Sequence, residues 1–599
     1  MKNILATAAA AFLLVTSTGC SGFLDEELKS SLSPDNTYTS SYGFEVGVNG
    51  LYGWARSEFN TWGGATTSQG QACPYESFQV ATDIVYTGHG DGSLVPFENL
   101  SYTPSTTFVT SYWNWGYGLI ASANEILEYS EGNVNWDKPT DKAYYQAIAR
   151  FFRAYAYRYL VYLYGDVPYV DKIEKDFRID FTRTPKAEVL GKMIEDLQFA
   201  IANLPEDPDK VEVGQLTKWA AQHMLSEVYL MAGKYAEAEA AAKAVIDCGY
   251  FHLMTSRFGA EKDKAGDPFS DMFKEYNQNR TSGNMESIWV MQLEYNTTGG
   301  GGANEDWTKR AWVPKYYNED GFVLADSLGG RGLAQIVPFK WWIDSNDFFA
   351  SSDIRNSEYN IKRNWYYNDA SSDKYGKKAE ITEETWTKFT IYPAVTKFFY
   401  GKAEDLSYGG NNKDRMKFRL AETYLLLAEA RLMQNNAQGA ADAINVIRKR
   451  ANAPEITAKD VMDWHNQMRK LKTKTGKYLS PTYLKTIHGQ LSTIFNHAVK
   501  YYDLSTNPAR KAGALGTEEG KEMLFWTKEE YKLFAEEMMD KPLSYYAFQL
   551  LYWCGIRSGE LLALTPADFN FKKKTLRINK SYQRLQGKDV ITTPKTKNS

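Results

Sequence analysis

Two short runs of aromatic residues contain the side chains best suited to hold a ligand. Trp341 and Trp342 are adjacent, and Trp365, Tyr366 and Tyr367 form the second run. Flat aromatic rings pack against the apolar faces of sugars, so both runs are candidate sugar-stacking platforms. Aromatic residues make up 15% of the chain, however, and each ring can equally well belong to a packed core.

Three other local patterns have both a binding and a structural interpretation. Asp83 precedes a Gly-rich loop at 89–92, where its carboxylate either contacts a ligand or fixes the loop. The glycines at 299–302 are not followed by the Lys-Ser/Thr pair of a phosphate-binding loop, which favours a flexible loop. Lys572, Lys573 and Lys574 fit either a solvated turn or contacts with phosphate groups.

Cysteine and histidine are too scattered for metal chemistry. The four cysteines contain no Cys-x-x-Cys pair, and the six histidines do not cluster. We therefore expect neither a disulfide framework nor a bound metal, and no cofactor.

The net charge of −4 conceals two parts of opposite charge. Residues 456–599 contain about 24 Lys and Arg against 14 Asp and Glu, roughly +10, which leaves roughly −14 for residues 1–455. The length of 599 residues and the hydrophobic share of 43% indicate several globular domains and exclude a collagen-like, disordered or polytopic membrane protein. An acidic large part joined to a basic small part indicates a different partner for each.

The N-terminus has the pattern of an export signal. Lys2 precedes an apolar stretch at 4–15 that is too short to span a bilayer as a mature anchor. The run Ser-Thr-Gly-Cys at 17–20 resembles a bacterial lipobox, with Ser17 in place of the usual Leu. This resemblance implies a signal peptide at 1–19 and acylation of Cys20, so that the protein would be held at a membrane by lipid alone. The alternative is a plain secretory signal with an incidental cysteine.

Hydrophobic periodicity predicts a mainly helical fold for residues 40–452. Helices are expected at 147–164, stopped by Gly165 and Pro168, and at 185–204. Residues 217–247 and 418–450 each have the pattern of a helix pair, broken at Gly233 and at Asn435-Asn436. Stacked tetratricopeptide-like pairs of this kind form an α-solenoid, because one pair cannot cover its own apolar face. Residues 250–415 are instead rich in Gly, Asn and aromatics, which predicts long irregular insertions that carry binding residues.

Several runs in this part of the chain, in this order, resemble the SusD/RagB family. They are Trp-Asn-Trp-Gly-Tyr at 113–117, Arg-Phe-Phe-Arg-Ala at 150–154, Tyr-Gly-Asp-Val-Pro at 164–168, Gly-Lys-Tyr at 233–235, Asp-Ile-Arg at 353–355 and Ile-Asn-Val-Ile-Arg-Lys-Arg-Ala at 444–451. The resemblance implies a surface lipoprotein of the outer membrane that captures a glycan or peptide and partners a TonB-dependent transporter, and that is not an enzyme. Asp83 lies where the family's ligand loop usually starts. The family's C-terminal block has no counterpart after residue 452, which implies a truncated domain.

The basic part has a different set of patterns. A helix is expected from Ser480-Pro481, another begins at the capping box Thr527 to Glu530, and residues 575–579 and 590–592 have the composition of two strands of a basic hairpin. Together with the run Gly-Ile-Arg-Ser-Gly-Glu at 555–560, these resemble a tyrosine recombinase (phage-type integrase). The resemblance implies a helical core-binding domain at 453–515 that contacts DNA, and a truncated α+β catalytic domain at 516–599.

The recombinase resemblance also implies residue roles. Arg557 corresponds to the first catalytic arginine, which stabilises the charged phosphoryl transition state, and Lys595 to the general acid of the hairpin. The nucleophilic tyrosine that follows these groups in the family is not matched in this sequence, so we expect no strand cleavage. Lys572, Lys573 and Lys574 are then candidate DNA contacts.

The two resemblances imply functions in different compartments. A signal peptide would carry the basic part away from cytoplasmic DNA, so both functions cannot operate in one mature chain. We expect the chain to be a fusion, and its larger part to set the main function, glycan or peptide capture at the outer membrane. The alternative is an inactive, DNA-binding integrase fragment in the cytoplasm.

Overall fold

The computed structural model describes residues 33–59, 75–89, 92–174, 178–301, 306–345, 348–454, 527–585 and 588–593, with short pieces between 488 and 512. The chain divides into two units, one of which includes 33–454 and the other 527–593. The predicted signal peptide, Cys20, Lys595 and most of the predicted core-binding segment lie outside the described residues.

The first unit is built on long helices. They are α3 (Ser41–Arg56), α6 (Thr107–Tyr129), α7 (Asp141–Tyr164), α8 (Lys186–Asn203), α9 (Lys218–Met231), α10 (Tyr235–Ile246), α15 (Leu420–Met433) and α16 (Ala437–Arg450), with short helices α2 (Pro34–Thr37), α4 (Glu76–Val80) and α5 (Val95–Glu98). The prediction of a mainly helical fold is confirmed. The helices of the predicted pairs at 217–247 and 418–450 also form, except that Phe418 belongs to a strand.

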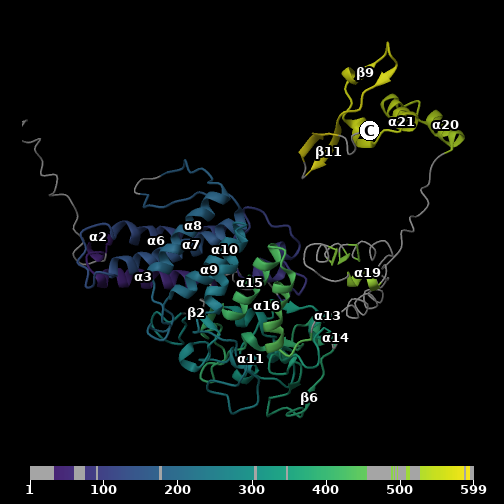
Figure 1. The fold of residues 1–599 in the computed structure, drawn as a ribbon. Coiled ribbons are helices and arrows are strands. Elements are labelled where there is room, and N and C mark those ends of the chain that lie inside the picture. The colour runs from purple at the N-terminus through teal and green to yellow at the C-terminus, as the bar shows by residue number, and fades with distance from the viewer. Residues whose placement is uncertain are drawn as a thin grey trace, which may run out of the picture. The chain divides into compact units, whose positions relative to one another are not determined.

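The long helices stack in a continuous series, which can be followed in Figure 1. Helix α6 packs on α7, α7 on α8, α8 on α9, α9 on α10, α10 on α15 and α15 on α16, so that helices nearly 200 residues apart in sequence become neighbours. A single large hydrophobic core runs through this series and includes the fully buried Phe151, Phe152 and Tyr155 of α7. We call α6–α10 with α15 and α16 the helical array.

Residues with positive φ end the helices where the sequence predicted breaks. Gly165 (φ 75°) caps α7, and Gly233 (φ 71°) separates α9 from α10. Asn435 (φ 64°) occupies the corresponding turn between α15 and α16. Glycine reaches this region without a steric penalty and asparagine is the side chain that tolerates it best, so both turns terminate a helix in the same way.

A buried ion pair holds three helices of the array together. Arg153 of α7 donates to Asp196 of α8 at 2.7 and 2.8 Å and to the side-chain oxygen of Asn124 of α6 at 2.9 Å. All three side chains are buried. A buried charge is tolerated when it is paired and fully hydrogen-bonded, so this contact fixes the register of the three helices.

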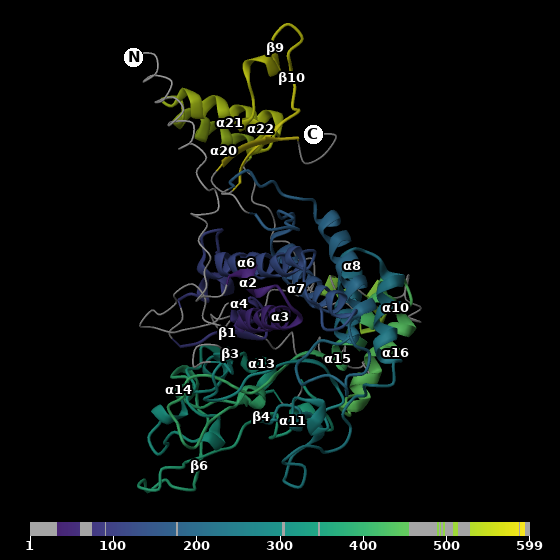
Figure 2. The same cartoon turned by 90° about the vertical axis from the view of Figure 1, so that its left-hand side faces the viewer.

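Residues 250–415 form an irregular segment with its own core. Its short elements are α11 (Pro268–Asp271), α12 (Thr308–Trp312), α13 (Lys340–Ile343), α14 (Glu383–Thr387), β2 (Ser287–Met291), β3 (Ile336–Pro338), β4 (Ile361–Lys362), β5 (Trp365–Tyr366), β6 (Lys378–Ala379) and β7 (Ala394–Val395). The strands form antiparallel pairs β4·β7 and β5·β6, while β3 pairs with β1 (Val85–Thr87) and β2 with β8 (Arg415–Arg419). Figure 2 shows this teal and green segment on one side of the helices, with β1 and β3 at the boundary.

The second unit contains helices and two hairpins among its described residues. The helices are α20 (Lys528–Glu537), α21 (Pro542–Cys554) and α22 (Ser558–Leu562), and Thr527 caps α20 through the predicted capping box. The single predicted hairpin is wrong: β10 (Thr575–Leu576) pairs with β9 (Phe569–Asn570), whereas β12 (Lys588–Thr592) pairs with β11 (Ser581–Leu585). The sequence pattern located β10 and β12 but not their partners β9 and β11, because pairing depends on turns that alternation does not specify.

Candidate functional site

Strand pairing brings Asp83 and Trp341 together across more than 250 residues. Strand β1 pairs antiparallel with β3, with Val85 opposite Pro338. Helix α13 starts directly after β3, and the backbone N–H of Phe339 donates to the carbonyl of Ile84 at 3.0 Å. The short helix is therefore fixed against the residues that precede β1.

Both tryptophans of α13 are anchored through their ring nitrogens. Trp341 Nε1 donates to the carbonyl oxygen of Asp83 at 3.0 Å, and Trp342 Nε1 donates to that of Ile84 at 2.6 Å. Trp341 is 49% exposed, whereas Trp342 is half-buried against the core of the irregular segment. With its polar atom satisfied by backbone, the Trp341 ring holds a fixed orientation and offers an apolar surface to solvent.

A phenylalanine that the sequence analysis missed extends this surface. Phe348 is 49% exposed, and its ring lies 5.3 Å from that of Trp341 in an edge-to-face arrangement. Ile84, beside Asp83, is also exposed. We call Trp341, Trp342, Phe348 and Ile84 the aromatic platform. The adjacent pair Phe348-Phe349, a few residues after the two tryptophans, is the sequence pattern that could have predicted this residue.

Asp83 supplies a carboxylate at the edge of the platform. Its side chain is exposed, and within the described residues its carboxylate makes no hydrogen bond or ion pair. A free carboxylate accepts hydrogen bonds from hydroxyl groups, while neighbouring rings pack on C–H faces. The residue whose backbone anchors Trp341 thus also has an exposed carboxylate.

The second aromatic run divides between core and surface. Trp365 is fully buried in the core of the irregular segment and donates through Nε1 to the carbonyl of Tyr392 at 3.0 Å, so it has no face for a ligand. The prediction that Trp365 stacks on a sugar is therefore wrong. Tyr366 follows it on strand β5 and points the other way, with 51% exposure, while Tyr367 is half-buried with its ring 4.9 Å from that of Phe322. Trp365 and Tyr366 lie on opposite faces because successive side chains of a β-strand alternate in direction.

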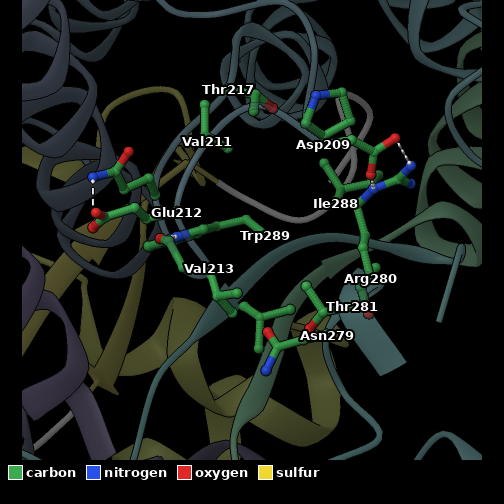
Figure 3. A pocket seen from close by; sticks show the side chains of 15 residues that line it. Asp209, Val211, Glu212, Val213, Thr217, Asn279, Arg280, Thr281, Ile288 and Trp289 are labelled. Carbon is green, nitrogen blue, oxygen red and sulfur yellow. Dashed lines mark hydrogen bonds and ion pairs between the residues drawn. The ribbon is translucent and has the colours of Figure 1, made fainter. Parts of the chain in front are cut away.

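The pocket in Figure 3 does not fit an oligosaccharide. Its volume is about 140 Å³, below the roughly 300–1,000 Å³ of typical small-molecule sites. Arg280 pairs with Asp209 through two contacts of 3.0 Å and also donates to the carbonyl of Tyr250. Trp289 donates to the carbonyl of Gly214 at 3.1 Å. These polar groups hold the walls of the pocket together.

In the second unit, Arg557 caps a helix. It is the N-cap residue of α22, and its guanidinium contacts the carboxylate of Glu560 at 3.1 Å while remaining 55% exposed. Lys572, Lys573 and Lys574 are exposed on the turn between β9 and β10, where Lys574 has φ 54°. Lys580 binds Asp568 at 2.8 Å, and this contact lowers the pKa of that carboxyl to about 2. The predicted partner Lys595 lies outside the described residues.

Comparison with known proteins identifies the family of the first unit. The family described as "SusD family" matches residues 269–473, and the family described as "Starch-binding associating with outer membrane" matches residues 57–230, together more than half of the chain. The chain belongs to the SusD/RagB family. The first match also extends beyond residue 452, the boundary predicted from the sequence.

Individual SusD relatives are similar over most of the chain. A SusD-like protein of Formosa agariphila is 23% identical over 477 residues, which are 74% of this chain and 81% of that protein. Surface glycan-binding protein A from Bacteroides thetaiotaomicron, solved with laminarihexaose, has a TM-score of 0.54 at 18% identity and covers 72% of this chain and 87% of its own. A SusD superfamily protein from Parabacteroides distasonis has a TM-score of 0.54 at 18% identity and covers 73% of this chain and 85% of its own. Proteins of this family bind ligands and are not enzymes. No described helix is long and apolar enough to cross a membrane.

Two recombinases match a smaller part of the chain. The ICEBs1 integrase of Bacillus subtilis is 34% identical over 151 residues, which are 25% of this chain and 39% of the integrase. A XerC-like tyrosine recombinase of Caldanaerobacter subterraneus is 33% identical over 130 residues, 19% of this chain and 33% of the recombinase. The chain thus spans about two fifths of these proteins or less.

Proposed function

We propose that the first unit captures an oligosaccharide at the bacterial surface through the aromatic platform. The observation that carries the proposal is the exposed Trp341 ring, anchored to the backbone of Asp83 and flanked by Phe348, on a fold whose relatives include a glycan-binding protein. Asp83 receives hydrogen bonds from sugar hydroxyls, and the rings pack on the apolar faces of the sugar. A peptide ligand stays the second candidate for the same surface, and Tyr366 is the outlying aromatic contact.

The test compares the full-length chain with two variants on a glycan and peptide array, with laminarihexaose as the reference oligosaccharide. Trp341→Ala removes the central ring, and Tyr162→Ala is the matched control because Tyr162 is an exposed aromatic (75%) on helix α7. We expect the unchanged chain and Tyr162→Ala to bind the same oligosaccharides, and Trp341→Ala to lose them. Equal binding by all three proteins would remove the platform from the proposal.

Membrane attachment and a transporter partner complete this proposal. The lipobox-like run that ends at Cys20 supports a lipid anchor at the outer membrane, and the family supports partnership with a TonB-dependent transporter. Cys20→Ser should abolish labelling with a palmitate analogue and release the protein from membranes. Unchanged labelling of this variant would contradict the anchor.

We propose a second, separate function for the basic part, binding of duplex DNA as a recombinase fragment. The partial identity with two recombinases supports it, as do the exposed lysines at 572–574 and the excess of basic residues after 455. The domain division at about residues 452 and 515 belongs to this proposal. DNA affinity of the full-length chain should fall steeply with salt, and replacing the three lysines by Gln should flatten the log–log slope by up to about three. Salt-independent binding would contradict it.

A further inference from the structure

A second site candidate lies within the first unit, under one face of strand β8. A cavity of about 280 Å³ is lined there by Arg415, Lys417 and Arg419, the alternate residues of that strand. Side chains two residues apart share a face of a strand, so β8 presents three cations to the cavity. Of the two intervening residues, Phe418 packs into the core of the helical array, whereas Met416 also borders the cavity.

Other elements add more cations and an aromatic wall. Arg158 of α7, Lys397 and Lys413 also line the cavity, which makes six basic residues in all. The walls between them include five aromatic side chains, Phe59, Tyr75, Tyr159, Phe273 and Phe398. None of the residues of the aromatic platform lines this cavity, so the two candidate sites are distinct.

Four of the six cations are held by carboxylates behind the cavity wall. The pairs are Arg158 with Glu227 at 2.7 Å, Lys417 with Glu58 at 2.9 Å, Arg415 with Asp306, and Arg419 with Glu286 at 3.5 Å. Glu286 is shared with Arg450, so it does not fully neutralise Arg419. The ammonium of Lys413 instead donates to three backbone carbonyls, those of Phe273, Lys397 and Phe399.

Among the described basic residues that line the cavity, Lys397 is the one for which neither a carboxylate nor a backbone carbonyl is a partner. Among the described residues no Asp or Glu forms an ion pair with it, and its ammonium lies 5.0 and 5.5 Å from the rings of Phe273 and Phe398. It borders the cavity and is exposed. Partial desolvation lowers the pKa of its ammonium, with Arg419 and Arg415 adding repulsion and only Glu422 opposing them. The two acids that line the cavity are themselves engaged, Asp414 with Asn279 and Glu422 with His223.

We propose that this cavity binds an anionic group, a carboxylate or a sulfate, with Lys397 as its direct contact. A bound anion pairs with Lys397, which has no carboxylate partner among the described residues, and it makes charge-assisted hydrogen bonds with the surrounding cations. The volume of about 280 Å³ is slightly below the roughly 300–1,000 Å³ of typical small-molecule sites, which suits one ion or one sugar unit. The aromatic walls favour a sugar that carries the anion, such as a uronic acid or a sulfated sugar. This inference does not depend on the aromatic platform.

The experiment is calorimetric titration of the full-length chain with sodium sulfate, sodium glucuronate and glucose at constant ionic strength. Lys397→Met removes the unpaired charge without breaking an ion pair. Lys138→Met, at an exposed lysine of the same unit, is the control that matches the change in net charge, and Lys397→Arg restores the charge. Circular dichroism and the thermal midpoint check that each variant is folded, and Lys397→Met should have nearly the stability of the unchanged chain because Lys397 is exposed and forms no ion pair among the described residues.

We expect saturable binding of sulfate or glucuronate to the unchanged chain, to Lys138→Met and to Lys397→Arg, and at least tenfold weaker binding to Lys397→Met. Tighter binding of glucuronate than of sulfate would identify a sugar-borne anion, and the reverse order a free oxyanion. Absence of saturable binding to the unchanged chain would overturn the proposal. Equal affinity of Lys397→Met, or binding of glucose as tight as that of glucuronate, would also overturn it.

Discussion

The helical array and the irregular segment of the first unit differ in some of their buried charges and in their exposed rings, although both have aromatic cores and buried ion pairs. The array buries its charge as a pair, Arg153 with Asp196, and encloses nearly all its large rings. The irregular segment buries lysines without carboxylates, such as Lys309, and leaves Trp341 half exposed. Regular helices satisfy their own backbone, whereas irregular chain needs side chains to do so. Irregular chain therefore has side chains anchored to its backbone carbonyls, and anchored side chains can form a binding surface.

Replacement of a buried ring should produce the largest effect on stability. Trp365→Ala leaves a cavity in the core of the irregular segment and removes the hydrogen bond to the carbonyl of Tyr392. We expect a loss of about 3–5 kcal/mol in the free energy of unfolding, measured by urea denaturation. A loss below about 1 kcal/mol would mean that this segment has no core of its own.

Replacement of the exposed ring should affect binding and spare stability. Trp341→Ala should weaken oligosaccharide binding tenfold or more, about 1.4 kcal/mol, because stacking on the platform is lost. Since the ring is half exposed, the free energy of unfolding should change far less than in Trp365→Ala. A loss of stability comparable to that of Trp365→Ala would show that Trp341 is a core residue.

The buried lysines should make stability depend on pH. Desolvation lowers the pKa of Lys309 to about 7 in the folded state, against 10.5 for the free side chain. Between these values the unfolded chain binds the additional proton, so the free energy of unfolding should rise from pH 7 to pH 9.5, by up to about 1.4 kcal/mol per pH unit for this group. Lys309→Met should flatten that rise in urea titrations at several pH values. The same slope in both proteins would show that Lys309 stays charged.

Tyr366 should give the smallest effect. It is 51% exposed on a two-residue strand, and among the described residues no hydrogen bond or ring contact joins it to the platform. We expect Tyr366→Ala to weaken oligosaccharide binding less than threefold by calorimetry. A loss as large as that in Trp341→Ala would extend the binding surface to strand β5.

The sequence predicted the helical array better than the site. Periodicity located α8, both helix pairs and the end of α7 closely, although α7 begins at Asp141 rather than at 147. Burial of one face repeats every 3.6 residues, and the stops at Gly165, Gly233 and Asn435 are local. It could not separate Trp341 from Trp365, since both occur in short aromatic runs. The difference arises from strand pairing over more than 250 residues, which places Trp341 against Asp83. Phe348 was missed because its contact with Trp341 depends on the folded structure and is not marked in the sequence.

Oxidative footprinting of the full-length chain tests oligosaccharide capture at the platform most directly. Hydroxyl radicals modify exposed aromatic rings, and mass spectrometry measures the rate at each residue with and without saturating laminarihexaose, or the array's strongest oligosaccharide if laminarihexaose does not bind. We predict that bound oligosaccharide slows oxidation of Trp341 and Phe348 several-fold and leaves Tyr162 of α7 unchanged. Equal oxidation of Trp341 in the free and the saturated protein would contradict the proposed site.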